Sequence, residues 1–197
     1  MDRRAGAGDA AVVQAVFDDA IALHRRMRDQ VPAAVVEAAA AMRAAFAARG
    51  KVLAFGNGGS ATDAQHLATE LVGRFERERD GLAAIALTAD GSVLTSVAND
   101  DSFARVFARQ VEALGRAGDV ALGISTSGNS ANVLAGLEAA AARGLTTIAL
   151  TGRDGGAIGT LAAIHIHVAD PSTARVQEVH RTVIHALCKL VEAATTS

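Results

Sequence analysis

Hydrophobic residues recur at spacings of three and four along the first fifty positions, which predicts helices there. The first apolar stripe comprises Val13, Val16, Phe17, Ile21 and Leu23. The second comprises Val35, Val36, Ala39, Met42 and Phe46. Pro32 separates the two stripes, because proline breaks or restarts a helix, and Gly50 is a favourable residue just beyond a helix end. The pattern therefore predicts a pair of helices over 10–49.

After Gly50 the pattern changes, and short apolar runs alternate with helix-length segments. The apolar runs are Val52–Phe55, Ala83–Leu87, Asp119–Ile124, Thr146–Leu150 and Ile164–Val168. The helical segments are 60–73, 91–115 with a break near Asn99, 130–143, a shorter one after Gly156, and 173–194. Strands that alternate with helices predict a parallel sheet covered on both faces, and nearly continuous apolar strands fit that burial. We therefore expect an α/β fold with a five-stranded parallel sheet behind a helical pair.

Two polar loops follow predicted strands at points where helices begin. The first is Gly56–Ser60, and the second, Ser125–Ser130, carries four hydroxyl groups. Ligands of open α/β sheets bind at the carboxyl ends of strands, and a helix N-terminus favours an anion. Neither loop has the lysine of a nucleotide-binding P-loop or the glycine spacing of a dinucleotide turn. We therefore expect a compact monophosphate as ligand, with two capped turns as the alternative.

Candidate acid–base and metal-binding groups lie on two of the predicted helices. His66 and Glu70 are four residues apart, so they share a helix face. Such a pair can ligate a metal or exchange protons, although surface pairs of this kind are common. On the last helix, Gln177 precedes His180 by three residues and His185 by eight, which is about 12 Å along the axis. Spacing alone does not choose between the two histidines.

Composition and charge exclude several classes of protein. The chain of 197 residues has a net charge of −2, no Trp and no Tyr, which argues against binding to a nucleic-acid backbone or stacking on bases. The single cysteine, Cys188, excludes an internal disulfide. No apolar run approaches the ~20 residues of a membrane span, and the N-terminus has no signal-peptide pattern. We therefore expect a cytoplasmic protein that binds neither nucleic acid nor membranes.

Taken together, these motifs resemble those of a known family. They are Gly56-Asn57-Gly58-Gly59-Ser60, Asp63-Ala64-Gln65-His66 with Glu70, Ser125-Thr126-Ser127-Gly128-Asn129-Ser130 and Val176-Gln177-Glu178-Val179-His180. The set resembles the phosphoheptose isomerases, which are sugar-isomerase (SIS) domain proteins, over roughly residues 10–193. Many SIS domains share the serine loop, whereas Asp-Ala-Gln-His combined with a distal Gln-Glu-x-x-His is much more specific.

The resemblance implies an aldose–ketose isomerase, which is an intramolecular oxidoreductase. The family converts sedoheptulose 7-phosphate to D-glycero-D-manno-heptose 7-phosphate, early in heptose-nucleotide biosynthesis. It also implies a homotetramer with active sites between subunits. The N-terminal helical segment, 1–50, would then serve oligomerisation, ahead of an SIS domain over 51–197, the two forming one structural unit.

The resemblance also assigns roles to individual residues. It implies that phosphate and nearby hydroxyls are held by Ser60, Ser125, Thr126, Ser127 and Ser130. The sugar would be lined by Asn57, Gly58, Gly59, Asn99 and Asp100, with Arg74, Glu70 and Gln177 as further substrate-binding residues. The family's zinc positions, one ion per subunit, correspond to His66, Glu70, Gln177 and His185. The resemblance thus selects His185 where spacing left His180 open.

The chemistry of this isomerisation gives Glu70 and His185 their expected roles. Moving a carbonyl from C2 to C1 removes a proton from C1 and returns one at C2 through an enediol. Glu70 is the better base and His185 the better acid or proton shuttle, and both are therefore expected to be catalytic. A zinc ion would polarise the carbonyl and stabilise the enediolate.

The sequence departs from the family pattern in two places, and two other functions compete. Ala174 stands where some members have an acidic residue, and the loop 89–92 differs from several relatives. One rival function is that of a non-enzymatic SIS tetramer that binds the bacterial replication-initiator protein, which segment 74–79 resembles. Such regulators lose the acid–base positions that Glu70 and His185 fill here. An SIS isomerase for another sugar phosphate is the other alternative.

Overall fold

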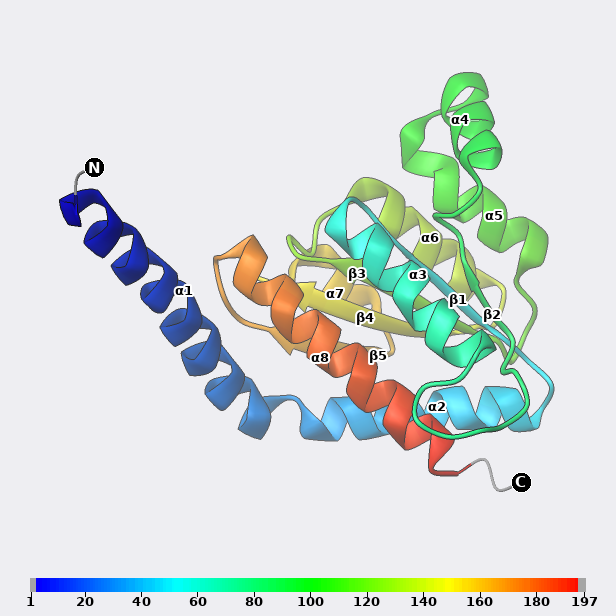
Figure 1. Cartoon of the computed structure of the whole chain (residues 1–197). Helices are drawn as coiled ribbons and strands as arrows, with labels where there is room; N and C mark the ends of the chain where they lie inside the picture. Colours follow the sequence, from blue (N-terminus) through cyan, green and yellow to red (C-terminus); the bar gives the residue numbers. More distant parts are fainter. Residues whose placement is uncertain (1–2, 195–197) are drawn as a thin grey trace.

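The computed structural model describes residues 3–194 of the chain and the side chains of residues 8–194. Five strands form one sheet: β1 Val52–Gly56, β2 Ala84–Ala86, β3 Val120–Ser125, β4 Thr146–Gly152 and β5 Ile164–Val168. The helices of the described part are α1 Arg3–Gln30, α2 Pro32–Ala47, α3 Gly59–Val72, α4 Gly91–Asp100, a 3₁₀ turn η1 Phe103–Arg105, α5 Val106–Leu114, α6 Ala131–Ala142, α7 Gly156–Leu161 and α8 Thr173–Glu192. The predicted α/β class is confirmed (Figure 1).

All neighbouring strands of the sheet run parallel, in the order β2-β1-β3-β4-β5. The chain leaves β1 to form β2 on one side and then returns past β1 to form β3 on the other. Val52 pairs with Ala84 of β2 and with Val120 of β3, so β1 is central at this end. The order of strands therefore reverses between β1 and β3, which is where open α/β sheets bind ligands.

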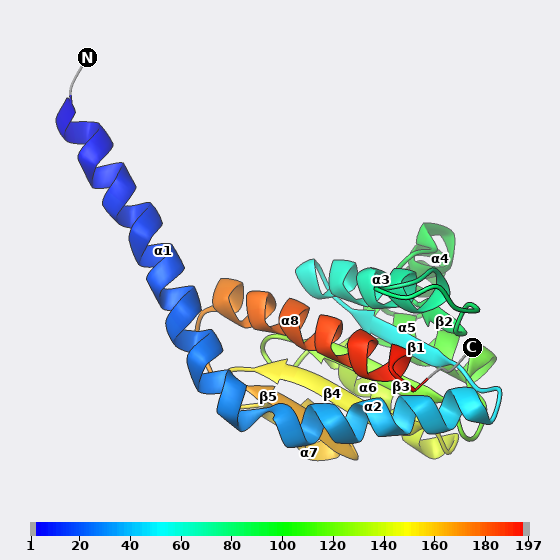
Figure 2. The ribbon, with the colours of Figure 1, turned by 60° about the horizontal axis from the view of Figure 1, so that its bottom comes forward.

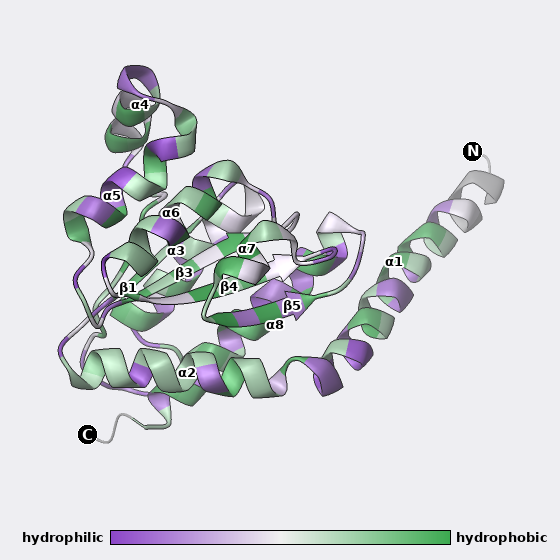
Figure 3. Ribbon diagram, turned by 180° about the vertical axis from the view of Figure 1, so that it is seen from behind, coloured by the Kyte–Doolittle hydropathy of each residue, from purple (hydrophilic) through white to green (hydrophobic). Residues whose placement is uncertain are grey.

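Hydrophobic side chains cover both faces of the sheet, as the apolar strands predict. One face packs against α2, α3 and α8 through a cluster that includes Met42, Leu67 and Leu187. The opposite face packs against α5, α6 and α7 through residues such as Phe107 and Leu137. Figure 3 shows the strands as mainly hydrophobic ribbon between these helical layers. Residues alternate between the faces because successive side chains of a strand point to opposite sides.

The first helix differs from the second in how much of it the rest of the chain covers. Helix α2 buries Val35, Ala38, Ala39, Met42 and Ala45 against the sheet side. Of the described side chains of α1, only Leu23 and Met27 are buried. The rest of α1 projects beyond the sheet (Figures 1 and 2).

Several predicted boundaries are wrong by a few residues. The strand expected over Ala83–Leu87 is only Ala84–Ala86, because only these three residues pair with β1. The break expected near Asn99 is confirmed, because α4 ends at Asp100 and Ser102 adopts an extended conformation before η1. The helices described also include none with the length and apolar character needed to cross a bilayer.

Candidate active site

The two polar loops lie side by side at the carboxyl ends of the adjacent strands β1 and β3. Asn57, just after β1, and Asn132, in the first turn of α6, exchange two amide hydrogen bonds of 2.8 and 2.9 Å. This reciprocal pair fixes the distance between the loops. Asn132 is buried, so its amide is satisfied by this pairing rather than by water. The structure thus brings the two predicted ligand loops to the point where the strand order reverses.

The serine loop, residues 125–130, gathers its hydroxyl groups in front of helix α6. Ser125 Oγ lies 2.9 Å from Ser130 Oγ and 3.3 Å from Ser127 Oγ. Gly128 has φ of +68°, and an added Cβ would meet the backbone of Gly155 at 2.2 Å, so only glycine fits this turn. Clustered hydroxyls at a helix N-terminus suit an anion such as a phosphate.

The first loop leads into α3 and places its polar residues against α8. Gly58 begins the helix with φ of +55°, and Ser60 is buried in the first turn. An added Cβ on Gly59 would lie 2.3 Å from Gln177 Nε2, so the absence of a side chain lets α8 approach. Gln177 therefore lies beside the first loop, as expected for a residue near the sugar.

A row of polar pairs follows the contact between α3 and α8, and we call it the α3–α8 seam. Beyond the Gly59–Gln177 contact, Arg181 donates to Asp63 over 2.7 Å, with Asp63 only 3% exposed. One turn further, His66 Nε2 lies 2.9 Å from His185 Nε2. The rows advance by three or four residues on each helix, which is the spacing of one helix face.

The proton-active groups of the seam are His66, Glu70 and His185. Glu70 Oε1 lies 3.5 Å from His66 Nε2, and the two imidazole rings are 5.1 Å apart between centroids. Because the two Nε2 atoms share one hydrogen bond, one donates and the other accepts. Burial, followed by the nearby Arg181 cation, lowers the pKa of His66. A lowered pKa favours the neutral form of the His66 imidazole.

The two histidines that sequence spacing left open are clearly separated by the structure. His185 joins the cluster with His66, whereas His180 points to the sheet, is fully buried and donates from Nε2 to the carbonyl oxygen of Thr151 over 3.2 Å. Burial lowers the pKa of His180 to about 4. Thus His180 lies outside the candidate site.

Three of the four predicted zinc ligands meet, and one stands apart. His66, Glu70 and His185 offer the imidazole and carboxylate donors that zinc binds. Gln177 lies two turns earlier on α8, beyond the Asp63–Arg181 pair. Within the described residues no group of three His, Cys, Asp or Glu has the arrangement of a metal site. The two Nε2 atoms at 2.9 Å are closer than the about 3.3 Å between two ligands of one tetrahedral zinc. The distances therefore differ from those of a zinc site, but the donor types of these three residues, two imidazoles and one carboxylate, fit zinc.

Comparison with known proteins shows which family has this sequence and fold. The model of the SIS domain matches residues 16–152. The chain is 52% identical to the phosphoheptose isomerase of Halorhodospira halophila over 183 residues, which are 91% of this chain and 92% of that protein. The solved phosphoheptose isomerase of Neisseria gonorrhoeae has a TM-score of 0.89 at 46% identity and covers 94% of this chain and 99% of its own.

The chain belongs to the phosphoheptose isomerases of the SIS-domain family. The solved phosphoheptose isomerase of Francisella tularensis has the same fold, with a TM-score of 0.91 at 37% identity over 94% of this chain and 98% of that one. The resemblance read from the motifs is therefore confirmed.

Three of the residues that the phosphoheptose isomerase motifs assign to substrate binding have no contact with the two polar loops. Arg74 is 59% exposed and pairs with Glu78 over 3.1 Å. Asn99 and Asp100 are exposed at the end of α4, where Asn99 donates to Asp100 over 2.8 Å. Helix α4 stands away from α8 in Figure 1. No hydrogen bond or ion pair in the described part of the chain joins these three residues to the two loops.

Sequence reasoning also missed residues that shape the site. Asn132, Asp63 and Arg181 had no assigned role, although Asp63 is three residues from His66 and Arg181 is four residues from both Gln177 and His185. This helical spacing was a usable signal. Phe75, whose ring centroid is 5.5 Å from that of His185, had no such signal, because it lies on a loop.

Proposed function

We propose that the protein is an enzyme that isomerises sedoheptulose 7-phosphate to D-glycero-D-manno-heptose 7-phosphate in heptose biosynthesis. The observation that carries the proposal is the cluster of Glu70, His66 and His185 on the α3–α8 seam. Helix α3, which carries His66 and Glu70, follows β1, and the serine loop follows the adjacent strand β3. The proton-active groups and the expected phosphate site therefore belong to neighbouring elements. Relatives that share about half of the sequence are named phosphoheptose isomerases.

Different residues of the chain bind the substrate and transfer its protons in the proposed reaction. The serine loop holds the phosphate through its hydroxyls and the N-terminus of α6. Glu70 takes the proton from C1, and His185 serves the second transfer at C2, which completes the enediol pathway. His66 lies against His185 and keeps the imidazole of His185 close to Glu70. Asn57, Gly58, Gly59 and Gln177 line the sugar near the start of α3.

Zinc is part of the proposal, with His66, Glu70 and His185 as the residues that would hold it. Their support is the meeting of two imidazoles and a carboxylate on one seam. A bound zinc ion supplies Lewis-acid polarisation of the substrate carbonyl. Removal of metal by a chelator is expected to lower turnover and to lower the melting temperature, because a ligand that binds only the native state stabilises it.

We further propose a homotetramer whose active sites lie between subunits. The support is the exposed apolar surface of α1, where Val12 and Phe17 are each 64% exposed. A groove of about 780 Å³ between α1, α2 and α8 continues this surface, and exposed apolar patches of this kind mark interfaces. Light scattering at micromolar concentration is expected to give four times the 20.0 kDa chain mass. A monomer at that concentration would contradict the assembly.

Turnover of sedoheptulose 7-phosphate by the pure protein tests the proposed function. The expected result is formation of the aldose phosphate, with a non-phosphorylated heptulose as a poor substrate. If pure, metal-loaded protein bound the sugar phosphate without converting it, the isomerase proposal would fail. The non-enzymatic binding protein would then be the better account.

A further inference from the structure

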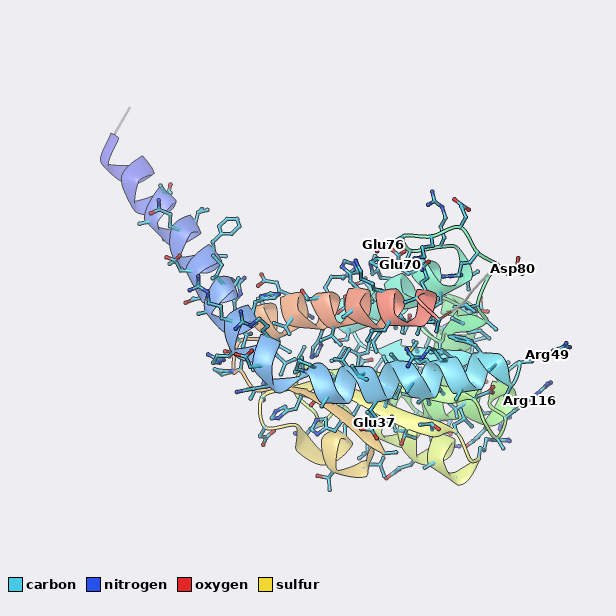
Figure 4. All side chains as sticks on the ribbon, turned by 90° about the horizontal axis from the view of Figure 1, so that it is seen from below. Glu37, Arg49, Glu70, Glu76, Asp80 and Arg116 are labelled. Carbon is cyan, nitrogen blue, oxygen red and sulfur yellow. The ribbon has the colours of Figure 1, made fainter. Side chains whose placement is uncertain are left out.

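The segment after α3 folds back over the ends of α3 and α8, and we call residues 74–80 the strap. Its sequence, Arg-Phe-Glu-Arg-Glu-Arg-Asp, is strongly charged, yet it carries one aromatic residue, Phe75. Glu70 lies just before the strap, and Glu76 and Asp80 lie within it (Figure 4). Within the strap, only Arg74 has a role assigned above, as a substrate-binding residue.

A buried carboxylate at the end of α8 holds the strap in place. Glu192 is only 2% exposed. Its oxygens accept hydrogen bonds from the backbone N–H groups of Phe75, Glu76 and Arg77, at 2.7, 2.9 and 3.1 Å. Burial alone would raise the pKa of Glu192, but these bonds and the Arg79 cation outweigh it and lower that pKa. Three donors on one buried carboxylate fix the backbone where Phe75 lies.

Arg79 attaches the strap to the C-terminal end of α3. Its guanidinium is 5% exposed and lies 3.3 Å from Glu192. It donates to the carbonyl oxygens of Glu70 at 2.7 Å and Leu71 at 2.8 Å. These are carbonyls of the last helical turn, which have no partner within the helix. Arg79 therefore ties the backbone of Glu70 to the same carboxylate that holds Phe75.

The strap delivers Phe75 to the candidate active site. The Phe75 and His185 rings are 5.5 Å apart with an interplanar angle of 31°, which lies within the range of favourable aromatic pairs. His185 in turn contacts His66. The imidazole of His185 is thus held between Phe75 of the strap and His66 of α3.

We propose that Glu192 and Arg79 are positioning residues for the isomerase reaction, which hold the strap so that Phe75 keeps His185 beside His66 and Glu70. The inference rests on the proposed function. Neither residue touches the reacting atoms, so both act through Phe75 and the backbone of Glu70. A small misplacement of a catalytic group is expensive, since about 1 Å costs on the order of 100-fold in rate.

The chain contains a matched control for the buried contact. Glu76 also joins the strap to α8, through an ion pair of 3.0 Å with Lys189. Its side chain is 51% exposed and that of Lys189 is 67% exposed, and such surface pairs contribute little. Glu192→Gln and Glu76→Gln are the same chemical change in the same pair of segments, one buried and one exposed.

The test compares kcat and KM for wild type, Glu192→Gln, Phe75→Leu, Glu76→Gln and the double variant Glu192→Gln/Phe75→Leu. We expect kcat to fall by about 10- to 100-fold in Glu192→Gln and about tenfold in Phe75→Leu, with KM changed less than kcat. The kcat of the double variant is expected to lie within about twofold of the kcat of Glu192→Gln, since both changes act through His185. Glu76→Gln is expected to keep wild-type kcat.

Backbone hydrogen exchange supplies a readout that does not depend on turnover. The amides of residues 75–77 are expected to exchange faster in Glu192→Gln and at the wild-type rate in Glu76→Gln. Unchanged kcat in a folded Glu192→Gln or Phe75→Leu, or multiplicative losses in the double variant, would overturn the inference. Should Glu192→Gln not fold, Arg79→Lys takes its place in the same comparison, with the same expected fall in kcat and the same faster amide exchange. Absence of turnover in wild type would overturn the proposed function instead.

Discussion

Helix α8 presents two faces of opposite character, and each carries a histidine. The face on the α3–α8 seam is partly exposed and holds Gln177, Arg181 and His185 opposite polar groups of α3. The face on the sheet holds His180 among fully buried aliphatic side chains such as Val176. The two histidines are five residues apart, yet only His185 is partly exposed and lies beside other proton-active groups. The comparison shows that solvent access and nearby partners, rather than residue type, give a histidine its chemistry.

The largest expected effect belongs to the carboxylate of the seam. Glu70→Gln keeps the shape of the side chain but removes its basicity, and loss of a general base costs about 10²- to 10⁴-fold in rate. Steady-state kinetics should show this fall in kcat, with light scattering confirming an unchanged assembly. Near-normal turnover by this variant would remove Glu70 from the mechanism.

The comparison itself is tested by changing one histidine at a time. His185→Gln is expected to lower kcat by about 10²-fold or more, because it removes the second proton-transfer group. His180→Gln should retain most of the wild-type kcat, since a buried group on the sheet side contacts no substrate. Equal losses in the two variants, measured in folded protein, would show that the two faces do not differ in function.

The serine loop belongs to neither face of α8, because it follows β3. Removal of its hydroxyl groups should therefore affect substrate binding rather than proton transfer. Ser125→Ala with Ser127→Ala removes two hydroxyls, and each charge-assisted hydrogen bond is worth about 1.5–3 kcal/mol. We expect KM to rise by about 100-fold or more, since 1.4 kcal/mol is a factor of ten, with a smaller change in kcat. An unchanged KM in titrations of sedoheptulose 7-phosphate would argue that the phosphate binds elsewhere.

The last expected effect is on stability rather than on activity, and it comes from the buried face. The pKa of His180 is about 4 in the folded chain, below the 6.5 of a free imidazole, so the unfolded state binds the extra proton between these values. The free energy of unfolding should therefore fall as pH drops from 6.5 to 4, by about 3 kcal/mol from this group. Denaturant titrations should show a shallower fall in His180→Gln. The same slope in both proteins would contradict a buried neutral His180.

The fold could be read from the sequence because its signals are local. The run Ile164–Val168 was predicted with its observed bounds, since its β-branched residues alternate with histidines and alanines flank it on both sides. The break near Asn99 was also predicted correctly, since α4 ends at Asp100 and Ser102 is extended before η1. The bounds of β2 were less well predicted, because only Ala84, Ile85 and Ala86 of the apolar run pair with β1.

The candidate site was only partly predictable, for a different reason. The loops at 56–60 and 125–130 follow strands, so their placement at one sheet edge follows from topology. The seam depends on how α3 and α8 are aligned, which tertiary packing decides. For that reason the Asp63–Arg181 pair, the separation of Gln177 from His185 and the contact of Phe75 with His185 emerged only from the structure.

The central claim, that the polar seam transfers protons through an enediol, is tested most directly by isotope incorporation. The reaction is run in deuterated water, and the aldose phosphate product is analysed by NMR for deuterium at C2. We expect wild type and His180→Gln to incorporate deuterium at C2, and Glu70→Gln to bind substrate without doing so. Product formed without deuterium at C2, or full incorporation by Glu70→Gln, would contradict the account.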